Sequence, residues 1–143
     1  MDVVNRLLMT EEDCEAAIGL YNGDWSRGTH LGYSIDELKS MFKDAPQCRA
    51  YGTFNNNTLI AWALIYDCHW WGYLDIFYVD LAYRKQGIAA RLLDFIKNEH
   101  LLKWHCIETH IMDDQTLRFF KKQGFNICDQ QLSWGVVHLK SKS

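Results

Sequence analysis

Three β-rich segments follow one another with short turns between them, and this run limits the possible folds more than any other feature of the chain. Residues 49–54 and 58–67 are separated by Asn55-Asn56-Asn57, a residue type that tolerates left-handed backbone and so predicts a hairpin. A second turn is expected near His69–Gly72, before a third strand over Tyr73–Val79. Because consecutive hairpin-connected strands pair antiparallel, the run disfavours a parallel nucleotide-binding sheet.

The remaining segments predict helices and strands on both sides of this run. Thr10 followed by Glu11, Glu12 and Asp13 is typical of a helix start, and Ser34 with Glu37 forms a second capping box. We expect an apolar strand over 3–9, helices over 10–21, 34–42, 87–100 and 114–123, and strands over 104–112, 125–128 and 132–139, with a polar turn over 129–131. This order predicts one α+β domain, residues 1–143, with a mixed sheet and with 132–139 as a candidate sheet edge.

Composition excludes several classes of protein. Of the 143 residues, 48% are hydrophobic and 14% aromatic, which is enough for one core without disulfide or metal support. The five cysteines lack C-x-x-C spacing and are interpreted as small core residues, and the histidines lack the spacing of metal ligands. No run approaches the roughly 20 apolar residues that a membrane span needs. We therefore expect a cytoplasmic protein with no metal, no membrane association and no nucleic-acid partner.

Charge is distributed unevenly along the chain. Residues 1–44 contain nine acids and four bases, a net charge of −5, whereas residues 45–143 contain nine acids and eleven bases, a net charge of +2. Such a division suggests two ligands of opposite sign that meet one domain.

The segment from Tyr78 to Ala89 runs from a strand through a basic loop into a helix that begins with Gly87. A helix start offers unpaired N–H groups and a positive dipole end, glycine allows close approach of a phosphate, and Arg84 and Lys85 add positive charge. The segment predicts a pyrophosphate site. The alternative is that Gly87 only packs the helix against the sheet while the basic side chains are solvated.

The pattern Arg84-x-x-Gly87-x-Ala89 resembles the R/Q-x-x-G-x-G/A motif of the GNAT superfamily of acetyl-CoA-dependent N-acetyltransferases. Residues 113–125 (DDQTLRFFKKQGF) are similar to the second CoA segment of that family, N-x-x-A-x-x-x-Y-x-x-x-G-F. The resemblance covers nearly the whole chain and implies a mostly antiparallel sheet of about seven strands with about four helices on both faces. It also implies acetyl-CoA as co-substrate, direct acetyl transfer to an amine, and a homodimer.

The resemblance also implies which residues bind the cofactor. In the family the strand that ends here at Val79 splays from its neighbour, so its backbone would run beside the pantetheine arm, and the Val79 N–H would polarise the acetyl carbonyl. Asp113 and Phe120 depart from the asparagine and tyrosine of the family pattern, and Phe120 cannot protonate the leaving thiolate. The implied cofactor-binding set is Phe77, Tyr78, Val79, Arg84, Lys85, Gln86, Gly87, Ile88, Ala89, Ala90, Asp113, Thr116 and Phe120.

Two groups are candidates for acid–base chemistry. Asp75 stands two residues before Phe77, where many family members have a glutamate that binds the acceptor amine or removes its proton through water; the alternative is a surface acid on an alternating strand. Glu108 and His110 alternate with Ile107, so they share one face of a neighbouring strand and form a second candidate pair.

Residues 62–79 (WALIYDCHWWGYLDIFYV) resemble the diamine and polyamine acetyltransferase branch, which implies a small cationic amine as acceptor. The residues expected to bind it are Asp24, Trp25, Trp71 and Asp75, with cation–π attraction from Trp70, Trp71 or Tyr73.

Three alternatives remain open at this point. The adjacent tryptophans also suit packing at a hairpin end, and Arg27 and His30 would suit an amino acid or a protein or peptide terminus. Phe120, in place of the tyrosine of the family pattern, suggests the alternative of a CoA-binding regulatory domain with little turnover. The charge division fits two ligands if the basic residues face the cofactor, namely Arg84, Lys85, Arg118, Lys121 and Lys122.

Overall fold

The computed structural model describes residues 2–22, 35–44, 47–100, 106–111, 114–130 and 135–140. Its elements, in chain order, are β1 (Val3–Leu7), α1 (Glu11–Asn22), α2 (Ile35–Asp44), β2 (Cys48–Asn55), β3 (Thr58–Asp67), β4 (Trp71–Val79), the 3-10 turn η2 (Leu81–Tyr83), α3 (Ile88–His100), β5 (Cys106–Ile111), α4 (Asp114–Lys122), β6 (Asn126–Gln130) and β7 (Gly135–Lys140). The order of strands and helices is the one that the sequence predicts.

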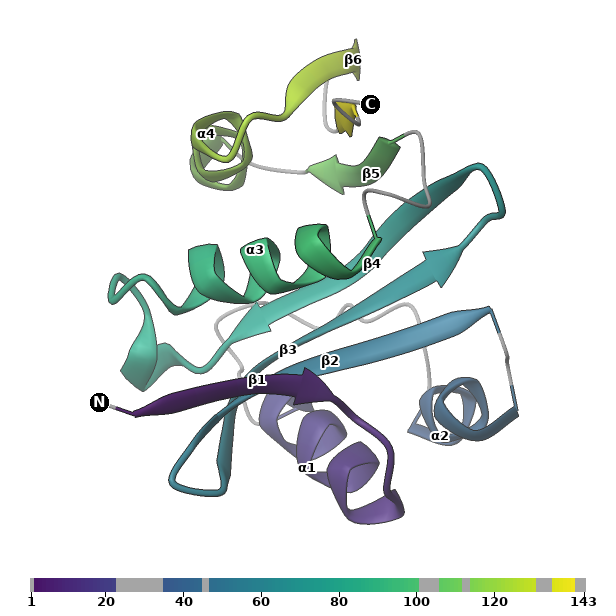
Figure 1. Ribbon diagram of the computed structural model, residues 1–143, viewed down its shortest axis with the longest axis vertical. Coiled ribbons are helices and arrows are strands. Elements are labelled where there is room, and N and C mark those ends of the chain that lie inside the picture. Colours follow the sequence, from purple (N-terminus) through teal and green to yellow (C-terminus); the bar gives the residue numbers. More distant parts are fainter. Residues whose placement is uncertain are drawn as a thin grey trace.

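The strands of the described residues form one mixed sheet in the order β1-β2-β3-β4-β5-β7-β6. All neighbouring strands pair antiparallel except β4 and β5, which are parallel and joined through α3. Helices α1 and α2 lie on one face of the sheet, and α3 lies on the other (Figure 1). The sheet therefore has a core on each face.

The core on the α3 face includes Ile88, Leu92 and Leu93 of α3 together with Phe120 of α4. The core on the opposite face joins Ala17 and Ile18 of α1 to Trp62 and other side chains of β3 and β4. Along β3, residues from Leu59 to Ile65 are all buried, because their side chains are divided between the two cores. Since β3 and β4 are covered on both faces, they form the rigid centre on which the site is built.

Several element boundaries differ from the prediction. The Asn55–Asn57 turn is present, with Asn56 and Asn57 at φ 50° and 69° as a tight hairpin requires. The next turn is shorter than expected, because β4 begins at Trp71 after a turn that includes His69 at φ 74°. Asp129 and Gln130 belong to β6 instead of the expected turn. The capping box at Ser34 lies outside the described residues.

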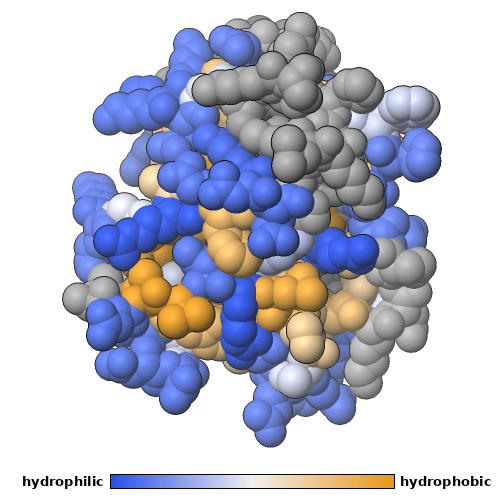
Figure 2. Space-filling model, viewed as in Figure 1, coloured by the Kyte–Doolittle hydropathy of each residue, from blue (hydrophilic) through white to orange (hydrophobic). Residues whose placement is uncertain are grey.

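The expected sheet edge is wrong. β7 pairs with β5 on one side and with β6 on the other, so it is an interior strand. The outer strands are β1 and β6. Figure 2 shows hydrophobic surface gathered along the level of β1 and interrupted by hydrophilic side chains. Val4 of this strand is 60% exposed.

The start of α1 is held by an acid that binds three partners. The Thr10 Oγ1 accepts the Asp13 N–H at 3.1 Å, and Asp13 accepts the Met9 and Thr10 N–H groups at 3.0 and 3.3 Å. Arg6 on β1 donates two bonds to the same carboxylate, at 2.8 and 3.0 Å. The bonds from Arg6, together with those from the two backbone N–H groups, hold the pKa of Asp13 well below its usual range.

We expect Asp13→Ala to lower the free energy of unfolding by about 1–2 kcal/mol, because it removes the carboxylate that binds Arg6 and accepts the Met9 and Thr10 N–H groups at the start of α1. Urea denaturation at neutral pH checks this, with Glu15→Ala on the exposed face of α1 as the control. Since the folded pKa lies below the unfolded value, the stabilisation is full above about pH 4 and declines at lower pH. Equal stability of Asp13→Ala and Glu15→Ala at neutral pH would contradict this role.

No helix in the described part of the chain is long and apolar enough to cross a membrane. Within the same residues, no group of three or more His, Cys, Asp or Glu side chains could hold a metal ion. The described cysteines are free thiols, but only Cys14 is buried; Cys48, Cys68 and Cys106 are partly exposed. The interpretation of the cysteines as core residues therefore holds for Cys14, and Cys128 lies outside the described side chains.

Candidate functional site

Strands β4 and β5 separate part of the way along their length. Their parallel pairing runs from Trp71 and Cys106 to Leu74 and Thr109 and goes no further in the described residues. At the last pair the Thr109 hydroxyl donates to the Leu74 carbonyl at 2.8 Å, inside the core. The side chain therefore takes up a carbonyl that the ladder no longer uses. Residues 75–79 of β4 have no partner on β5 in the described part of the chain, and we call this end of the pairing the split.

Main-chain groups of two β4 residues point into this split. The Asp80 N–H donates to the Ile60 carbonyl, and Ala61 is the Cα partner of Val79. Because hydrogen-bonded and non-bonded pairs alternate in an antiparallel ladder, the main-chain groups of Phe77 and Val79 face away from β3. Those of Tyr78 face β3, so the backbone role expected for Tyr78 is not supported by its orientation.

A β-bulge lies where the split begins. Ile65 is the Cα partner of Leu74, and Leu64 that of Ile76, so Asp75 is an extra residue on β4. Bulges redirect side chains and are common beside active sites. Asp75 acts electrostatically on Tyr73 and Cys48, so its carboxylate lies near both side chains.

The loop after β4 leads directly into α3. Gly87 caps the helix with its carbonyl, which accepts the Arg91 N–H at 3.1 Å, so the first N–H groups of α3 have no partner within the helix. Gly87 has φ +80°, and a Cβ there would meet no protein atom within 4 Å. Glycine is thus required by the backbone conformation, while the space beside it is open. No acid lies in the first turn of α3, which suits an anion.

The side chains of this loop have separate positions. Arg84 donates from Nε to the Val79 carbonyl at 2.8 Å and lies 5.4 Å from the centre of the Tyr78 ring. Lys85 is exposed and has φ 63°, and Gln86 donates to the Ala82 carbonyl at 3.2 Å. The expected loop residues Arg84 to Ala90 are therefore brought together around the start of α3, with Ile88 anchored in the core.

The second expected CoA segment meets the split through aromatic rings. The Phe120 ring is buried at 3% exposure and lies 6.1 Å from the ring of Phe77, measured between centres. It also packs against Phe125 at 4.9 Å. Thr116 lies in the first half of α4 and is half-buried, whereas Asp113 lies outside the described residues. The structure thus joins Phe77 and Phe120, which are far apart in sequence.

The expected basic cluster is only partly supported. Lys97 of α3 donates to the Gln123 carbonyl at 2.9 Å, which ties the end of α4 to the later half of α3. Lys97 lies about 14 Å along the helix from Ile88, at 1.5 Å per residue. Lys121 and Lys122 therefore stand at the end of α4 away from the loop, where their positive charges interact favourably with the negative end of the helix dipole.

Aromatic side chains gather on the face of the sheet opposite to Phe120. The rings of Tyr66 and Tyr73 stack with centres 6.4 Å apart, and Trp71 lies 6.2 Å from Tyr73. The Tyr73 hydroxyl is 2.5 Å from Nδ1 of His110 on β5. Trp70, by contrast, is 65% exposed and contacts His69. We call Tyr66, Trp71, Tyr73 and His110 the aromatic cluster.

Acidic side chains flank this cluster. Glu108 is the Cα partner of Tyr73, and Ile107 faces the α3 core, so Glu108 and His110 project from the same face of β5, as predicted. Asp75 follows on β4. Burial, together with Asp75 and Tyr66 nearby, raises the pKa of Tyr73 to about 12. Asp24 and Trp25 lie outside the described residues.

Two thiols near this face are poor nucleophiles. Burial raises the pKa of Cys48, and burial together with Asp67 and Glu108 raises that of Cys68. A protonated thiol reacts slowly, so these side chains suit a site in which no acyl-cysteine forms.

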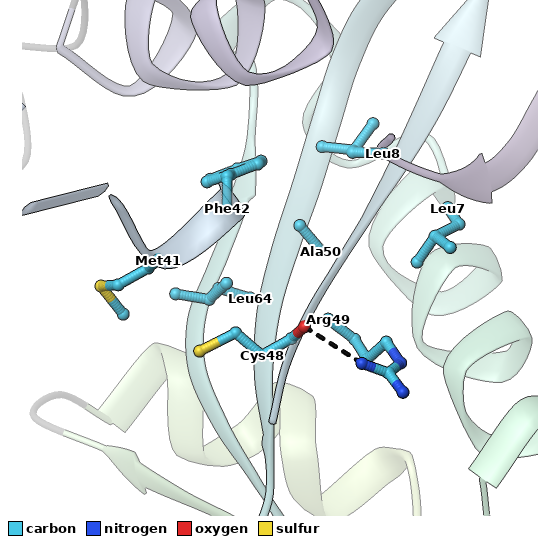
Figure 3. A pocket seen from close by; sticks show the side chains of 8 residues that line it. All are labelled: Leu7, Leu8, Met41, Phe42, Cys48, Arg49, Ala50 and Leu64. Carbon is cyan, nitrogen blue, oxygen red and sulfur yellow. Dashed lines mark hydrogen bonds between the residues drawn. The ribbon is translucent and has the colours of Figure 1, made fainter. Parts of the chain in front are cut away.

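A pocket of about 340 Å³ lies at the edge of β2, beyond the end of β1 (Figure 3). It is lined by Leu7, Leu8, Met41, Phe42, Cys48, Arg49, Ala50 and Leu64, and includes none of the expected site residues. The Tyr66 hydroxyl lies 3.7 Å from the Met41 sulfur, so the pocket adjoins the aromatic cluster through Met41.

The sequence did not indicate the roles of Thr109, Tyr66 or the contact of Tyr73 with His110. Tyr73 and Asp75 are two residues apart, as are Glu108 and His110, and this spacing places each pair on one face of its strand. Only the parallel register, in which Tyr73 faces Glu108, brings the two pairs together.

Several solved acetyltransferase structures share this fold over nearly the whole chain. The PaiA N-acetyltransferase of Thermoplasma acidophilum in complex with coenzyme A has a TM-score of 0.81, 18% identity, and coverage of 98% of this chain and 99% of its own. The ribosomal-protein-S18-alanine N-acetyltransferase of Escherichia coli has a TM-score of 0.82, 15% identity, and coverage of 99% and 96%. An N-acetyltransferase of Staphylococcus aureus Mu50 has a TM-score of 0.81, 18% identity, and coverage of 99% and 100%. No curated protein sequence gives a significant match.

Residues 14–125 match the acetyltransferase (GNAT) family, and the chain belongs to this family. The protein is an N-acetyltransferase that uses acetyl-CoA as co-substrate. The described residues fit acetyl-CoA, since the start of α3 offers N–H groups and open space beside Gly87 for its phosphates. Phe77 and Val79 direct main-chain groups into the split. Acetyl-CoA supplies the activated acetyl thioester.

We expect Gly87→Asp to weaken CoA binding at least tenfold, because it places a negative charge at the start of α3 and a side chain at φ +80°. Isothermal titration calorimetry with CoA checks this, and circular dichroism verifies folding. Gly19→Ala is the control, since Gly19 lies in α1 and a Cβ there meets nothing within 4 Å. Unchanged CoA affinity in folded Gly87→Asp would remove the phosphate site from this loop.

Proposed function

We propose that this enzyme transfers the acetyl group to a primary amine of a small cationic molecule of the polyamine type. The observation that carries the proposal is the aromatic cluster with Asp75 and Glu108 beside it, on one face of the sheet at the start of the split. Aromatic faces and carboxylates attract an ammonium group and disfavour a carboxylate.

Each group would have a separate task. Asp75 stands one residue beyond the last β4–β5 pair, so its carboxylate would hold the ammonium at the point where the strands part. The N–H groups of Phe77 and Val79 would donate to the carbonyl oxygens of the acetyl donor. The N–H groups at the start of α3 would bind its phosphates.

The buried Phe120 affects only part of this arrangement. Its ring lies on the α3 face against Phe77, whereas the aromatic cluster lies on the other face. A phenylalanine there removes a proton donor for the leaving sulfur and leaves the acceptor side unchanged. Loss of that donor is therefore compatible with turnover.

Thiol release from acetyl-CoA with a panel of amines tests the acceptor class. We expect diamines and polyamines to give kcat/KM values at least tenfold above those of neutral amines, amino acids and peptides with a free N-terminus. Higher kcat/KM for the peptides would assign the enzyme to protein or peptide acetylation. Thiol release with none of these amines would contradict the proposal.

We expect Asp75→Asn to raise the KM for a diamine about tenfold, equivalent to about 1.4 kcal/mol, and to leave the KM for acetyl-CoA unchanged. Asp94→Asn is the matched control, because Asp94 on α3 is 65% exposed and pairs only loosely with Lys97 at 3.7 Å. Similar diamine KM values for the two variants would remove Asp75 from the acceptor site.

The homodimer expected from the family resemblance stays a prediction. Sedimentation equilibrium should then give twice the chain mass of 16.8 kDa. A species of single chain mass over the whole concentration range would contradict it.

A further inference from the structure

The contact of Tyr73 with His110 crosses from β4 to β5 where the two strands begin to part. Tyr73 faces Glu108 in the parallel register, and His110 stands two residues further along β5, level with the bulge at Asp75. The Tyr73 hydroxyl lies 2.5 Å from His110 Nδ1, and the two rings meet edge to face with centres 5.3 Å apart. The pair therefore lies at the acceptor side of the split.

Packing holds the inner member of the pair in one orientation. The ring of Tyr66 stacks on Tyr73 at an interplanar angle of 19°, and Trp71 contacts it from the neighbouring position. Tyr73 is half-buried, while His110 is exposed. A hydrogen bond thus leads from the half-buried start of the split toward solvent.

We propose that Tyr73 and His110 form a proton relay that deprotonates the acceptor amine, a proposal that rests on the acetyltransferase function above. The ammonium passes a proton to the Tyr73 oxygen while the Tyr73 hydroxyl passes its own proton to His110 Nδ1. The amine nitrogen then bonds to the acetyl carbon, and the carbon–sulfur bond breaks with its electron pair on sulfur. The remaining surplus proton on nitrogen is taken up by that sulfur, and His110 releases its proton to solvent.

The relay requires that the Tyr73 hydroxyl carries a proton that it can donate to His110. Because burial and the neighbouring Asp75 raise the pKa of Tyr73 to about 12, the phenol keeps its proton at neutral pH. The relay needs Tyr73 as the donor and Nδ1 as the acceptor, which is the arrangement of the imidazole tautomer with its proton on Nε2. The other described titratable groups around the pair are Tyr66 on β3, Asp75 on β4 and Glu108 on β5.

The relay does not depend on a tyrosine at position 120. Tyr73 lies on the opposite face from Phe120, so it serves the attacking nitrogen and does not replace a donor to sulfur. The sulfur instead receives its proton from the nitrogen that attacks.

The experiment compares Tyr73→Phe, His110→Gln and the double variant across pH, with acetyl-CoA and the best amine of the panel. We expect each single variant to lose at least tenfold in kcat, with little change in the KM for acetyl-CoA. The double variant should lose no more than either single, because both act as one unit. The pH profile of kcat/KM should differ between the wild type and His110→Gln, because an imidazole can take up a proton and an amide cannot.

Tyr51→Phe is the control. Burial raises the pKa of Tyr51, like that of Tyr73, to about 12, but Tyr51 lies in the α3-side core against Phe95. Its kcat should match the wild type. Wild-type kcat in Tyr73→Phe, or losses that multiply in the double variant, would overturn the relay.

A second measurement separates the relay from the acceptor class. Nitrogen-15 NMR of the His110 ring at neutral pH should show the Nε2–H tautomer in the wild type and a mixture of tautomers in Tyr73→Phe. An Nδ1–H tautomer in the wild type would overturn the relay whichever amine is acetylated. Failure of the amine panel, with the expected NMR result, would overturn only the cationic acceptor.

Discussion

The end of the β4–β5 ladder is the constraint on which the rest of the site depends. If β4 and β5 were paired along their full length, no main-chain groups would be left for a ligand. Where the pairing ends, a carbonyl without a hydrogen-bond partner inside the core would cost free energy. Thr109 meets that cost by donating to the Leu74 carbonyl. The bulge at Asp75 then turns the following residues, so that Phe77 faces the α3 core beside Phe120. The Thr109 hydroxyl and the bulge residue Asp75 thus set the place where Phe77 turns to the cofactor side and the aromatic cluster stays on the acceptor side.

The sequence predicted the order of elements because its signals are local. Asparagines that accept positive φ, the cap at Thr10 and the glycine before α3 each act within a few residues, and each is found where expected. The phosphate loop could be predicted for the same reason. Strand placement is not local: β7 pairs on both sides, although its pattern would equally suit an edge strand.

The acceptor side was the least predictable part of the site. Asp75, Glu108 and His110 could be proposed from alternation, but their neighbours depend on a register between β4 and β5 that is set by distant packing. Charge was a weaker guide, since Lys121 and Lys122 lie at the end of α4 tied to Lys97, far from the loop. A net charge counted along the chain does not show which end of a helix carries it.

The contact between Arg84 and the Val79 carbonyl has a thermodynamic consequence. The guanidinium already satisfies a main-chain acceptor that faces the split. A ligand amide that bonds to this carbonyl therefore replaces one hydrogen bond by another, and the released guanidinium must find water or an anion. The gain in binding free energy is the difference between the free energies of the bonds that form and of the bond from Arg84 that breaks. Counting ligand hydrogen bonds would therefore overstate the affinity.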